Sequence, residues 1–192
     1  QEAFYGLSRA ENMEEVQHAA SLVHSPGLNI MHGDIQGNIA WWASAKLPIR
    51  SATADSKSIQ DGSLAENDIL GWYDFSKNPQ TINPERGFIF STNNSPEDVD
   101  GVHYPGYYYA GNTRAASIIA ALSTDKSDWT MEDSQELQMS THSPVYERNC
   151  KMMCAYAAEN NFEGVYAEYF EKMKAWSGTH GMEEVEPTIY YR

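Results

Sequence analysis

Apolar residues near the N-terminus recur at the spacing of a helix. Residues 8–24 carry one such stripe, Ser8 or Asn12 can cap its start, and Pro26-Gly27 ends it. We therefore expect one amphipathic helix over residues 8–24. Its apolar stripe consists of Val16, Ala19, Ala20 and Val23.

The next two apolar segments have the two-residue period of strands. Residues 28–34 alternate partly, residues 39–45 carry Trp41-Trp42, and the turn Gln36-Gly37-Asn38 lies between them. A glycine–asparagine turn between two short strands predicts a β-hairpin. Successive side chains of a strand point to opposite faces, so at least one of the paired tryptophans is expected in the core.

A long polar stretch separates this hairpin from the next apolar run. Residues 50–67 are rich in Ser, Asp and Ala and predict a surface loop, and residues 78–84 hold Asn-Pro pairs that predict a turn-rich connection. Residues 87–90 then read Gly-Phe-Ile-Phe and stop at an Asn-Asn-Ser-Pro turn. This pattern predicts a buried strand that delivers the carboxamide of Asn93 to its end.

Helical signals dominate the second half of the chain. Residues 115–122 predict one helix, and Thr130 followed by Asp133 predicts the capped start of a second. Ser143-Pro144 favours the start of a third, because proline suits the first turn of a helix. Residues 160–176 carry an aromatic stripe that predicts a fourth.

This order of elements predicts an α+β fold, with strands in the first half and a mostly helical second half. We expect a sheet-containing segment over residues 1–114 and a helical segment over residues 115–192. A chain of 192 residues can bury a substantial core.

The formal net charge of −14 bears on whether the protein binds nucleic acid. Phosphate backbones repel such a surface, and no basic cluster is present, so we expect no nucleic-acid partner. A solvated acidic surface is the simplest interpretation. No run of 18 apolar residues occurs, so no membrane-spanning segment is expected.

The two cysteines, Cys150 and Cys154, are four residues apart in a predicted helix. That geometry suits a disulfide poorly, and two thiols are too few for a structural zinc site. Buried, unreactive thiols are therefore expected. His32 and Asp34 could form half a metal site, but without a third ligand a hydrogen-bonded pair is the preferred interpretation.

Familiar catalytic motifs, such as a nucleophile elbow, a His-Glu-x-x-His helix or a phosphate-binding loop, are absent from the sequence. Asn93 at a strand end and Arg114 at a helix start would instead place an amide and a guanidinium at the rim of one cleft. Both residues also have structural interpretations. Such an asparagine commonly ties its own turn, and such an arginine commonly pairs with an acid.

Taken together and in order, the motifs resemble those of the penicillin acylase (penicillin amidase) family. The resemblance covers nearly all 192 residues. The matching segments are Asp34 to Trp41, Lys46 to Arg50, Trp72, Phe75 to Pro79, Asn83 to Ile89, Asn93 to Pro96, Gly111 to Arg114 and Trp176 to Gly178.

The resemblance implies an N-terminal-nucleophile hydrolase with an αββα sandwich, of which this chain is an internal segment of the large subunit. In that family a serine freed by self-cleavage attacks the amide, and its own amino group acts as the base. By position, Asn93 matches the oxyanion-hole asparagine and Arg114 matches the arginine that orients the nucleophile region. The chemistry requires no cofactor.

The chain also departs from the family pattern. Residue 1 is Gln rather than the nucleophilic serine, and Gly62-Ser63 lies in the wrong place for self-cleavage. We therefore expect the isolated chain to be inactive and to need the nucleophile-bearing segment and the small subunit as partners. The family binds calcium through the loop after the asparagine; here Asp98 or Asp100 could supply the carboxylate.

The expected substrates are small amides, either β-lactam side-chain amides or N-acyl homoserine lactones, and the family location is periplasmic or secreted. The alternative is a non-enzymatic binding domain with an aromatic surface. That surface would use Trp41, Trp42, Trp72 and Tyr107 to Tyr109. An independently folding piece is the third possibility, and its exposed edges would favour self-association.

Overall fold

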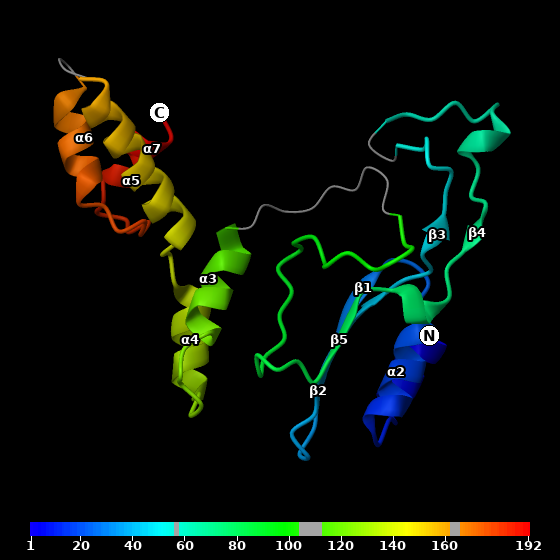
Figure 1. Cartoon of the computed structure of the whole chain (residues 1–192). Coiled ribbons are helices and arrows are strands. Elements are labelled where there is room, and N and C mark those ends of the chain that lie inside the picture. The colour runs from blue at the N-terminus through cyan, green and yellow to red at the C-terminus, as the bar shows by residue number, and fades with distance from the viewer. Residues whose placement is uncertain (56–57, 104–112, 162–165) are drawn as a thin grey trace. The chain divides into compact units, whose positions relative to one another are not determined.

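The computed structural model describes residues 1–55, 58–103, 113–161 and 166–192. The chain divides into two compact units, Gln1–Ala110 and Gly111–Arg192, each of which is described by itself (Figure 1). The described strands belong to the first unit, while the second unit is helical. The predicted α+β class is confirmed.

Two helices open the first unit, α1 (Glu2–Leu7) and α2 (Met13–Ser21). The helix expected over residues 8–24 is confirmed only over Met13–Ser21, so its predicted bounds are too wide. Ser8 ends α1, because its hydroxyl donates to the Tyr5 carbonyl at 2.8 Å. Asn12 caps α2, since its side chain accepts a hydrogen bond from the Glu15 backbone N–H at 2.9 Å.

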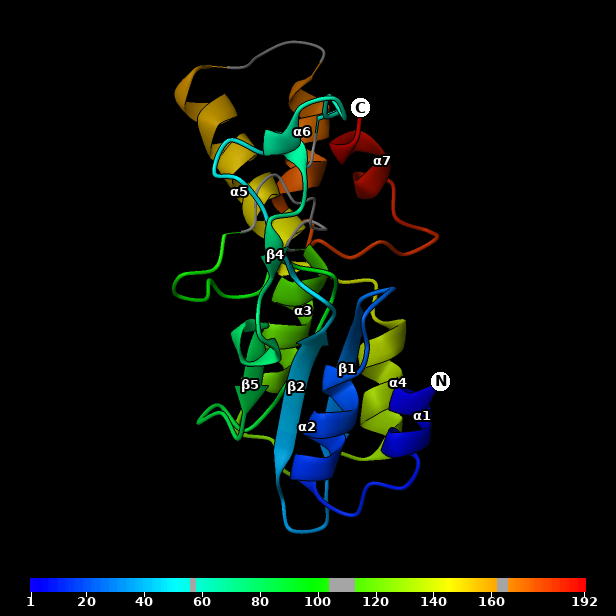
Figure 2. The same cartoon turned by 90° about the vertical axis from the view of Figure 1, so that its right-hand side faces the viewer.

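A three-stranded antiparallel sheet follows, in the order β1 (Leu28–Gly33), β2 (Ile39–Ser44) and β5 (Gln80–Ile82) (Figure 2). The predicted hairpin is confirmed, with Ile30 opposite Trp42. The turn-rich connection expected over residues 78–84 is wrong, because β5 lies within it. Its proline-containing pairs bracket a strand, and the Pro79 carbonyl accepts from Ala43 N–H at 2.9 Å.

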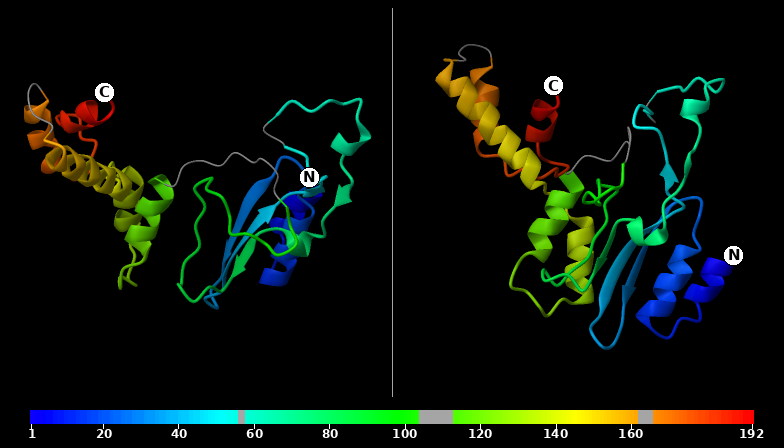
Figure 3. Two further views of the ribbon diagram at one scale, coloured as in Figure 1. Left: turned by 45° about the horizontal axis from the view of Figure 1, so that its top comes forward. Right: turned by 45° about the vertical axis from the view of Figure 1, so that its right-hand side comes forward.

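Helix α2 covers one face of this sheet (Figure 3). Trp42 is completely buried there, packed with Val16, Ala20 and Ala40. Trp41 is on the opposite face, only partly buried, and its indole N–H donates to Asn29 Oδ1 at 2.8 Å. The alternation of the strand thus places one tryptophan in the core, as expected.

A smaller two-stranded sheet pairs β3 (Pro48–Ile49) with β4 (Gly71–Trp72). The polar stretch between them is largely exposed and contains one short 3₁₀ turn, η1 (Ala65–Asn67). A second such turn, η2 (Phe75–Lys77), leads into β5, and Asp74 caps it through the Ser76 N–H at 2.9 Å.

The strand expected at residues 87–90 does not form. The guanidinium of Arg86 instead packs beside both Phe88 and Phe90, its carbon 5.2 and 5.3 Å from the two ring centroids. Arg86 Nε also donates to the Phe88 carbonyl at 2.9 Å. In a sheet, this carbonyl oxygen would accept a hydrogen bond from a neighbouring strand. Here it accepts from the side chain of Arg86 instead.

The helices of the second unit begin largely where the capping signals place them. They are α3 (Thr113–Leu122), α4 (Met131–Met139), α5 (Pro144–Glu159), α6 (Ala167–Lys174) and α7 (Glu186–Tyr190). The helix expected over residues 160–176 is shorter than predicted, and residues 162–165 lie outside the described residues. Helix α7 was not predicted. Across the described ranges no helix combines the length and apolarity needed to cross a bilayer.

The core of the second unit lies between α5, α6 and the segment after α6. It consists of Cys150, Cys154, Met173 and Trp176. Both cysteines are buried and not disulfide-bonded, which confirms the sequence interpretation. Burial raises the pKa of the Cys150 thiol to about 11, and its Sγ–H donates to the Met173 carbonyl at 3.0 Å. Such a thiol stays protonated and unreactive near neutral pH.

Candidate active site

The turn that follows Phe90 uses its two asparagines differently. Thr92 is buried, and its backbone N–H and its hydroxyl donate to Asn94 Oδ1 at 3.1 and 2.9 Å. Asn94 Nδ2 donates in turn to the Ser95 carbonyl at 3.1 Å. The carboxamide of Asn94 is therefore occupied in building the turn.

Asn93 is at the exposed apex of the same turn. Its φ of 61° lies in the left-handed region, where asparagine is tolerated better than most side chains. Asn93 is exposed, whereas Asn94 is partly buried within the turn. Exposure makes Asn93 the candidate of the two to meet a ligand.

A polar cleft with a volume of about 170 Å³ adjoins this turn. It is bounded by residues of β2 and β5 on one side and by the chain from Arg86 to Val99 on the other. Its lining comprises Trp41, Pro79, Gln80, Thr81, Arg86, Phe90, Ser91, Asn94, Ser95, Pro96, Glu97, Asp98 and Val99.

Arg86 is the residue of this cleft that sequence reasoning missed. The signal was present, because residues 86, 88 and 90 alternate and fall on one side of an extended segment. We interpreted the apolar run at residues 87–90 as a strand and did not connect it with Arg86, which packs against both phenylalanine rings. The stack fixes the guanidinium at the wall of the cleft.

Arg114 lies in the first turn of α3 and is exposed, while its neighbour Ala115 is buried. It belongs to the second unit, whereas Asn93 belongs to the first. The convergence of the two side chains on one cleft therefore stays a prediction. The aromatic residues Tyr107 to Tyr109 lie outside the described residues.

Asp34 and His32 lie together at the hairpin, but His32 Nε2 makes no hydrogen bond in the described part of the chain, so the hydrogen-bonded pair expected there does not form. His32 Nε2 lies 3.5 Å from Asp34 Oδ2, and the same carboxylate accepts from Asn38 Nδ2 at 2.8 Å. The Asn38 side chain, helped by its backbone N–H and by His32, holds the pKa of Asp34 below its usual value. These contacts fix the turn around Gly37, whose φ is 88°.

Asp98 and Asp100 are both exposed. In the ranges that the structure describes, no three acidic, histidine or cysteine side chains gather closely enough to hold a metal ion. These two carboxylates alone do not fit the six to eight oxygen ligands that calcium prefers. We therefore derive no step through calcium.

The alternative function, a non-enzymatic binding domain, requires an exposed aromatic surface that includes Trp42. Trp42 is completely buried and cannot stack on a ligand. Trp72 is 45 % exposed, but it lies in the small sheet with Lys46 Nζ 4.7 Å from its ring centroid. Trp41 instead lines the cleft beside the asparagine turn.

Comparison with known proteins gives one family and one well-matched fold. The sequence profile of the penicillin amidase family matches residues 1–192. Among solved structures, a thermostable penicillin G acylase from Alcaligenes faecalis superposes with a TM-score of 0.72 at 22 % sequence identity. The match covers 94 % of this chain and 32 % of the acylase chain, so the chain spans about a third of that relative.

Proposed function

Because the chain belongs to the penicillin amidase family, we propose that it supplies the oxyanion-stabilising part of an enzyme that hydrolyses the amide bond of N-acylated small molecules. In this proposal the 192 residues are a segment of the catalytic subunit. The nucleophilic serine and the small subunit come from the remaining parts of the acylase. The fold of the chain, which matches that of a penicillin G acylase, supports this role.

The observation that carries the proposal is the geometry of the turn at Asn93. Asn93 is exposed in this turn, while the hydrogen bonds between Asn94 and the buried Thr92 hold the adjacent backbone. A donor that is fixed before the reaction stabilises developing negative charge without reorganising. Asn93 Nδ2–H would donate to the oxyanion of the tetrahedral intermediate.

The remaining steps follow the logic of a serine nucleophile with its own amine as base. The serine oxygen bonds to the amide carbon, the hydroxyl proton passes to the amine, and the carbonyl oxygen becomes the oxyanion. Collapse of this intermediate breaks the C–N bond as the α-ammonium group returns its proton to the departing nitrogen. The amine leaves, and water hydrolyses the remaining ester to the carboxylic acid and the free serine. Arg114, at the start of α3, is proposed to orient the nucleophile region.

We propose the same two substrate candidates that the sequence suggested, β-lactam side-chain amides and N-acyl homoserine lactones. Both present a secondary amide between an acyl group and a small polar amine. We propose a periplasmic or secreted location and no cofactor in the chemical steps. The isolated chain, lacking the serine, is expected to show no turnover of a chromogenic phenylacetyl amide.

The test replaces Asn93 by Ala in the assembled enzyme. Loss of one oxyanion donor is expected to lower kcat about 100- to 1,000-fold, because the interaction forms only in the transition state. KM should change little. The unfolding midpoint should fall slightly, because alanine fits the left-handed backbone at residue 93 less well than asparagine.

The matched control is Asn161→Ala, because Asn161 is also an exposed asparagine with a left-handed backbone, at a φ of 51°. It follows α5 and does not line the cleft. This variant should keep kcat within about twofold of the parent, as expected for a surface substitution. Turnover by Asn93→Ala at the parental rate would remove Asn93 from the site.

A further inference from the structure

Strand β5 lies between two asparagine–proline pairs, and in each pair the proline lacks the backbone N–H that a sheet would use. The preceding asparagine supplies a side-chain contact instead. Asn78 Nδ2 donates to the carbonyls of Ala43 and Ala45 at 2.7 and 2.8 Å. Asn83 Oδ1 accepts from the Ile39 N–H at 2.9 Å. Two carboxamides therefore tie the two ends of β5 to β2 and to the residue that follows it.

Asn83 makes three hydrogen bonds to the hairpin formed by β1 and β2. Its N–H donates to the Ile39 carbonyl at 2.9 Å, and its Oδ1 receives the Ile39 N–H in return. An antiparallel pair normally uses a backbone carbonyl for that second bond, whereas here the side chain provides the oxygen. Asn83 Nδ2 also donates to Asn38 Oδ1 at 3.1 Å, and Asn38 Nδ2 in turn donates to Asp34 Oδ2 in the hairpin turn at 2.8 Å. The carboxamide of Asn83 is thus joined to the hairpin turn as well as to β2.

The chain reverses directly after Asn83. The Gly87 N–H donates to the Pro84 carbonyl at 2.9 Å, and Gly87 has a φ of 72°. Asn83 itself has a φ of 45°, in the left-handed region that asparagine tolerates better than most residues. The segment that follows this reversal carries the turn at Asn93. Asn83 therefore marks the point at which the chain leaves the sheet for the candidate catalytic turn.

We propose that Asn83 is a positioning residue for the oxyanion-hole asparagine, Asn93. By fixing the start of the connecting segment to the hairpin, its carboxamide sets where the turn at Asn93 stands relative to the sheet. Asn83 acts through Asn93 and is not itself a catalytic residue. The inference rests on the proposed function and adds to it a residue that lies ten positions earlier in the chain.

The position of an oxyanion donor has to be set from outside its own turn. The hydrogen bonds between Thr92 and Asn94 hold the shape of the turn, but they do not join it to the sheet. A donor must lie within about 2.7–3.1 Å of the oxyanion to stabilise it. A misplacement of about 1 Å can lower the rate about 100-fold. Loss of the two exposed hydrogen bonds of the Asn83 side chain is expected to cause a smaller shift and a smaller loss.

The test is a double-mutant cycle in the assembled enzyme, with a chromogenic phenylacetyl amide as the substrate. Asn83→Gly removes the carboxamide, and glycine adopts the left-handed backbone without strain. We expect kcat to fall about tenfold, less than the roughly 100-fold loss for a misplacement of about 1 Å. In an Asn93→Ala background the same change should alter kcat by less than about twofold, because the residue through which Asn83 acts is already gone.

Asn83→Asp is the conservative variant, and it replaces Asn83→Gly in the cycle if that variant does not assemble. It keeps an oxygen acceptor for the Ile39 N–H and loses the donor to Asn38, so its kcat should lie between those of the parent and Asn83→Gly. Asn161→Gly is the matched control, because Asn161 is also exposed and has a φ of 51°. It lies in the second unit, so kcat should stay within about twofold of the parent.

Hydrogen–deuterium exchange keeps this proposal separate from the catalytic one. In the assembled enzyme, Asn83→Gly should speed exchange at the backbone amides of Ile39 and Thr92, and Asn161→Gly should not. If Asn93→Ala turns over at the parental rate, the proposed function fails, and exchange at Thr92 alone decides whether Asn83 positions the turn. Equal losses of kcat in the parental and Asn93→Ala backgrounds, or unchanged exchange at Thr92, would overturn the positioning role. So would a parental kcat for Asn83→Gly.

Discussion

At the scale of single residues, the adjacent asparagines Asn93 and Asn94 have different structural roles. The Asn94 carboxamide accepts from Thr92 and donates to the Ser95 carbonyl, whereas Asn93 is exposed. Composition or spacing does not distinguish the two. The difference arises from the left-handed backbone at residue 93, which a sequence pattern does not specify.

Asp34 shows how a turn carboxylate couples stability to pH. Its oxygens accept from Gln36 N–H, Asn38 N–H and Asn38 Nδ2, and the pKa is lowered chiefly by the Asn38 side chain. A carboxyl whose pKa is lower in the folded state stabilises the fold above the unfolded pKa. That contribution is lost as the pH falls through the folded value.

We therefore expect Asp34→Asn to lower the urea midpoint at pH 7, and the difference from the parent to shrink below about pH 4. Asp68→Asn is the control, since Asp68 is exposed and accepts no hydrogen bond among the described side-chain contacts. Denaturation curves at several pH values provide the measurement. A difference that stays constant from pH 7 to pH 3 would show that the ionised carboxylate does not matter.

At the scale of elements, helix starts were predicted from sequence more reliably than strands. Thr130 and Asp133 form the expected capping box, and Pro144 begins α5 as expected. Such signals act between residues three apart, so the sequence contains both partners. Strands need partners far along the chain, which is why β5 was missed and residues 87–90 were wrongly assigned.

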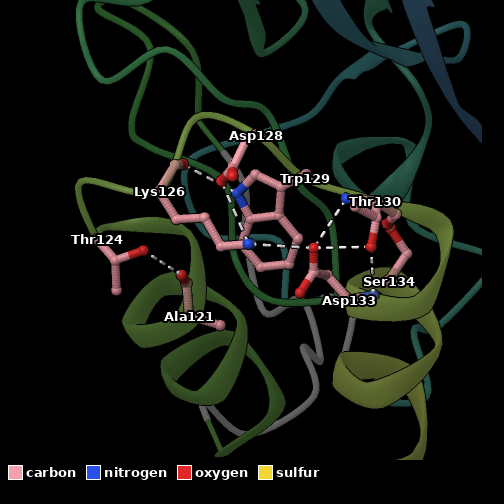
Figure 4. Close-up of polar contacts among 8 residues, drawn as sticks. All are labelled: Ala121, Thr124, Lys126, Asp128, Trp129, Thr130, Asp133 and Ser134. Carbon is pink, nitrogen blue, oxygen red and sulfur yellow. Dashed lines mark hydrogen bonds and ion pairs between the residues drawn. The ribbon is translucent and has the colours of Figure 1, made fainter.

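The capping box at α4 allows a quantitative test. Thr130 Oγ1 accepts from Asp133 N–H at 3.2 Å, and the Asp133 carboxylate accepts from Thr130 N–H at 2.8 Å (Figure 4). Lys126 Nζ lies 3.2 Å from the same carboxylate. The Thr130 backbone, the Thr130 hydroxyl and Lys126 together lower the pKa of Asp133.

Thr130→Ala should lower the free energy of unfolding by about 1 kcal/mol, the typical loss for an N-cap hydroxyl. Thr124→Ala removes a hydroxyl that donates to the Ala121 carbonyl at the end of α3, outside any N-cap, and should have a smaller effect (Figure 4). Equilibrium urea unfolding measures both. Equal losses for the two variants would contradict the capping interpretation.

Gly178 joins the segment after α6 to the start of α5. Its φ is 83°, and a Cβ there would lie 2.5 Å from the Ser143 carbonyl oxygen and 2.8 Å from the Glu147 nitrogen. The Ser143 N–H donates to the Gly178 carbonyl at 3.1 Å. Close approach and a left-handed backbone both exclude a side chain at this position.

Gly178→Ala is expected to lower the free energy of unfolding by roughly 2 kcal/mol or more, from the left-handed backbone and the clash together. Gly62→Ala serves as the matched change, because a Cβ at residue 62 meets no atom within 4 Å and its φ is not in the left-handed region. Thermal unfolding compares the two. A Gly178 variant as stable as the Gly62 variant would show that the junction adapts easily.

At the scale of the whole molecule, the chain spans 32 % of the penicillin G acylase that it resembles in fold. Its described surface keeps large apolar side chains exposed, including Trp72, Met152 and Tyr156. The remaining parts of an acylase are the partners that we propose for these faces. Self-association of the isolated chain, which size-exclusion chromatography with light scattering would detect, stays a prediction.

The central claim is that the Asn93 carboxamide meets the oxyanion of an amide substrate. The most direct measurement is a crystal structure of the assembled enzyme with a boronic acid bound to the nucleophilic serine, as a mimic of the tetrahedral intermediate. We expect Asn93 Nδ2 within about 2.7–3.1 Å of the boronate oxygen that replaces the oxyanion. A boronate oxygen bound by other donors, with the residue-93 side chain facing elsewhere, would contradict the account.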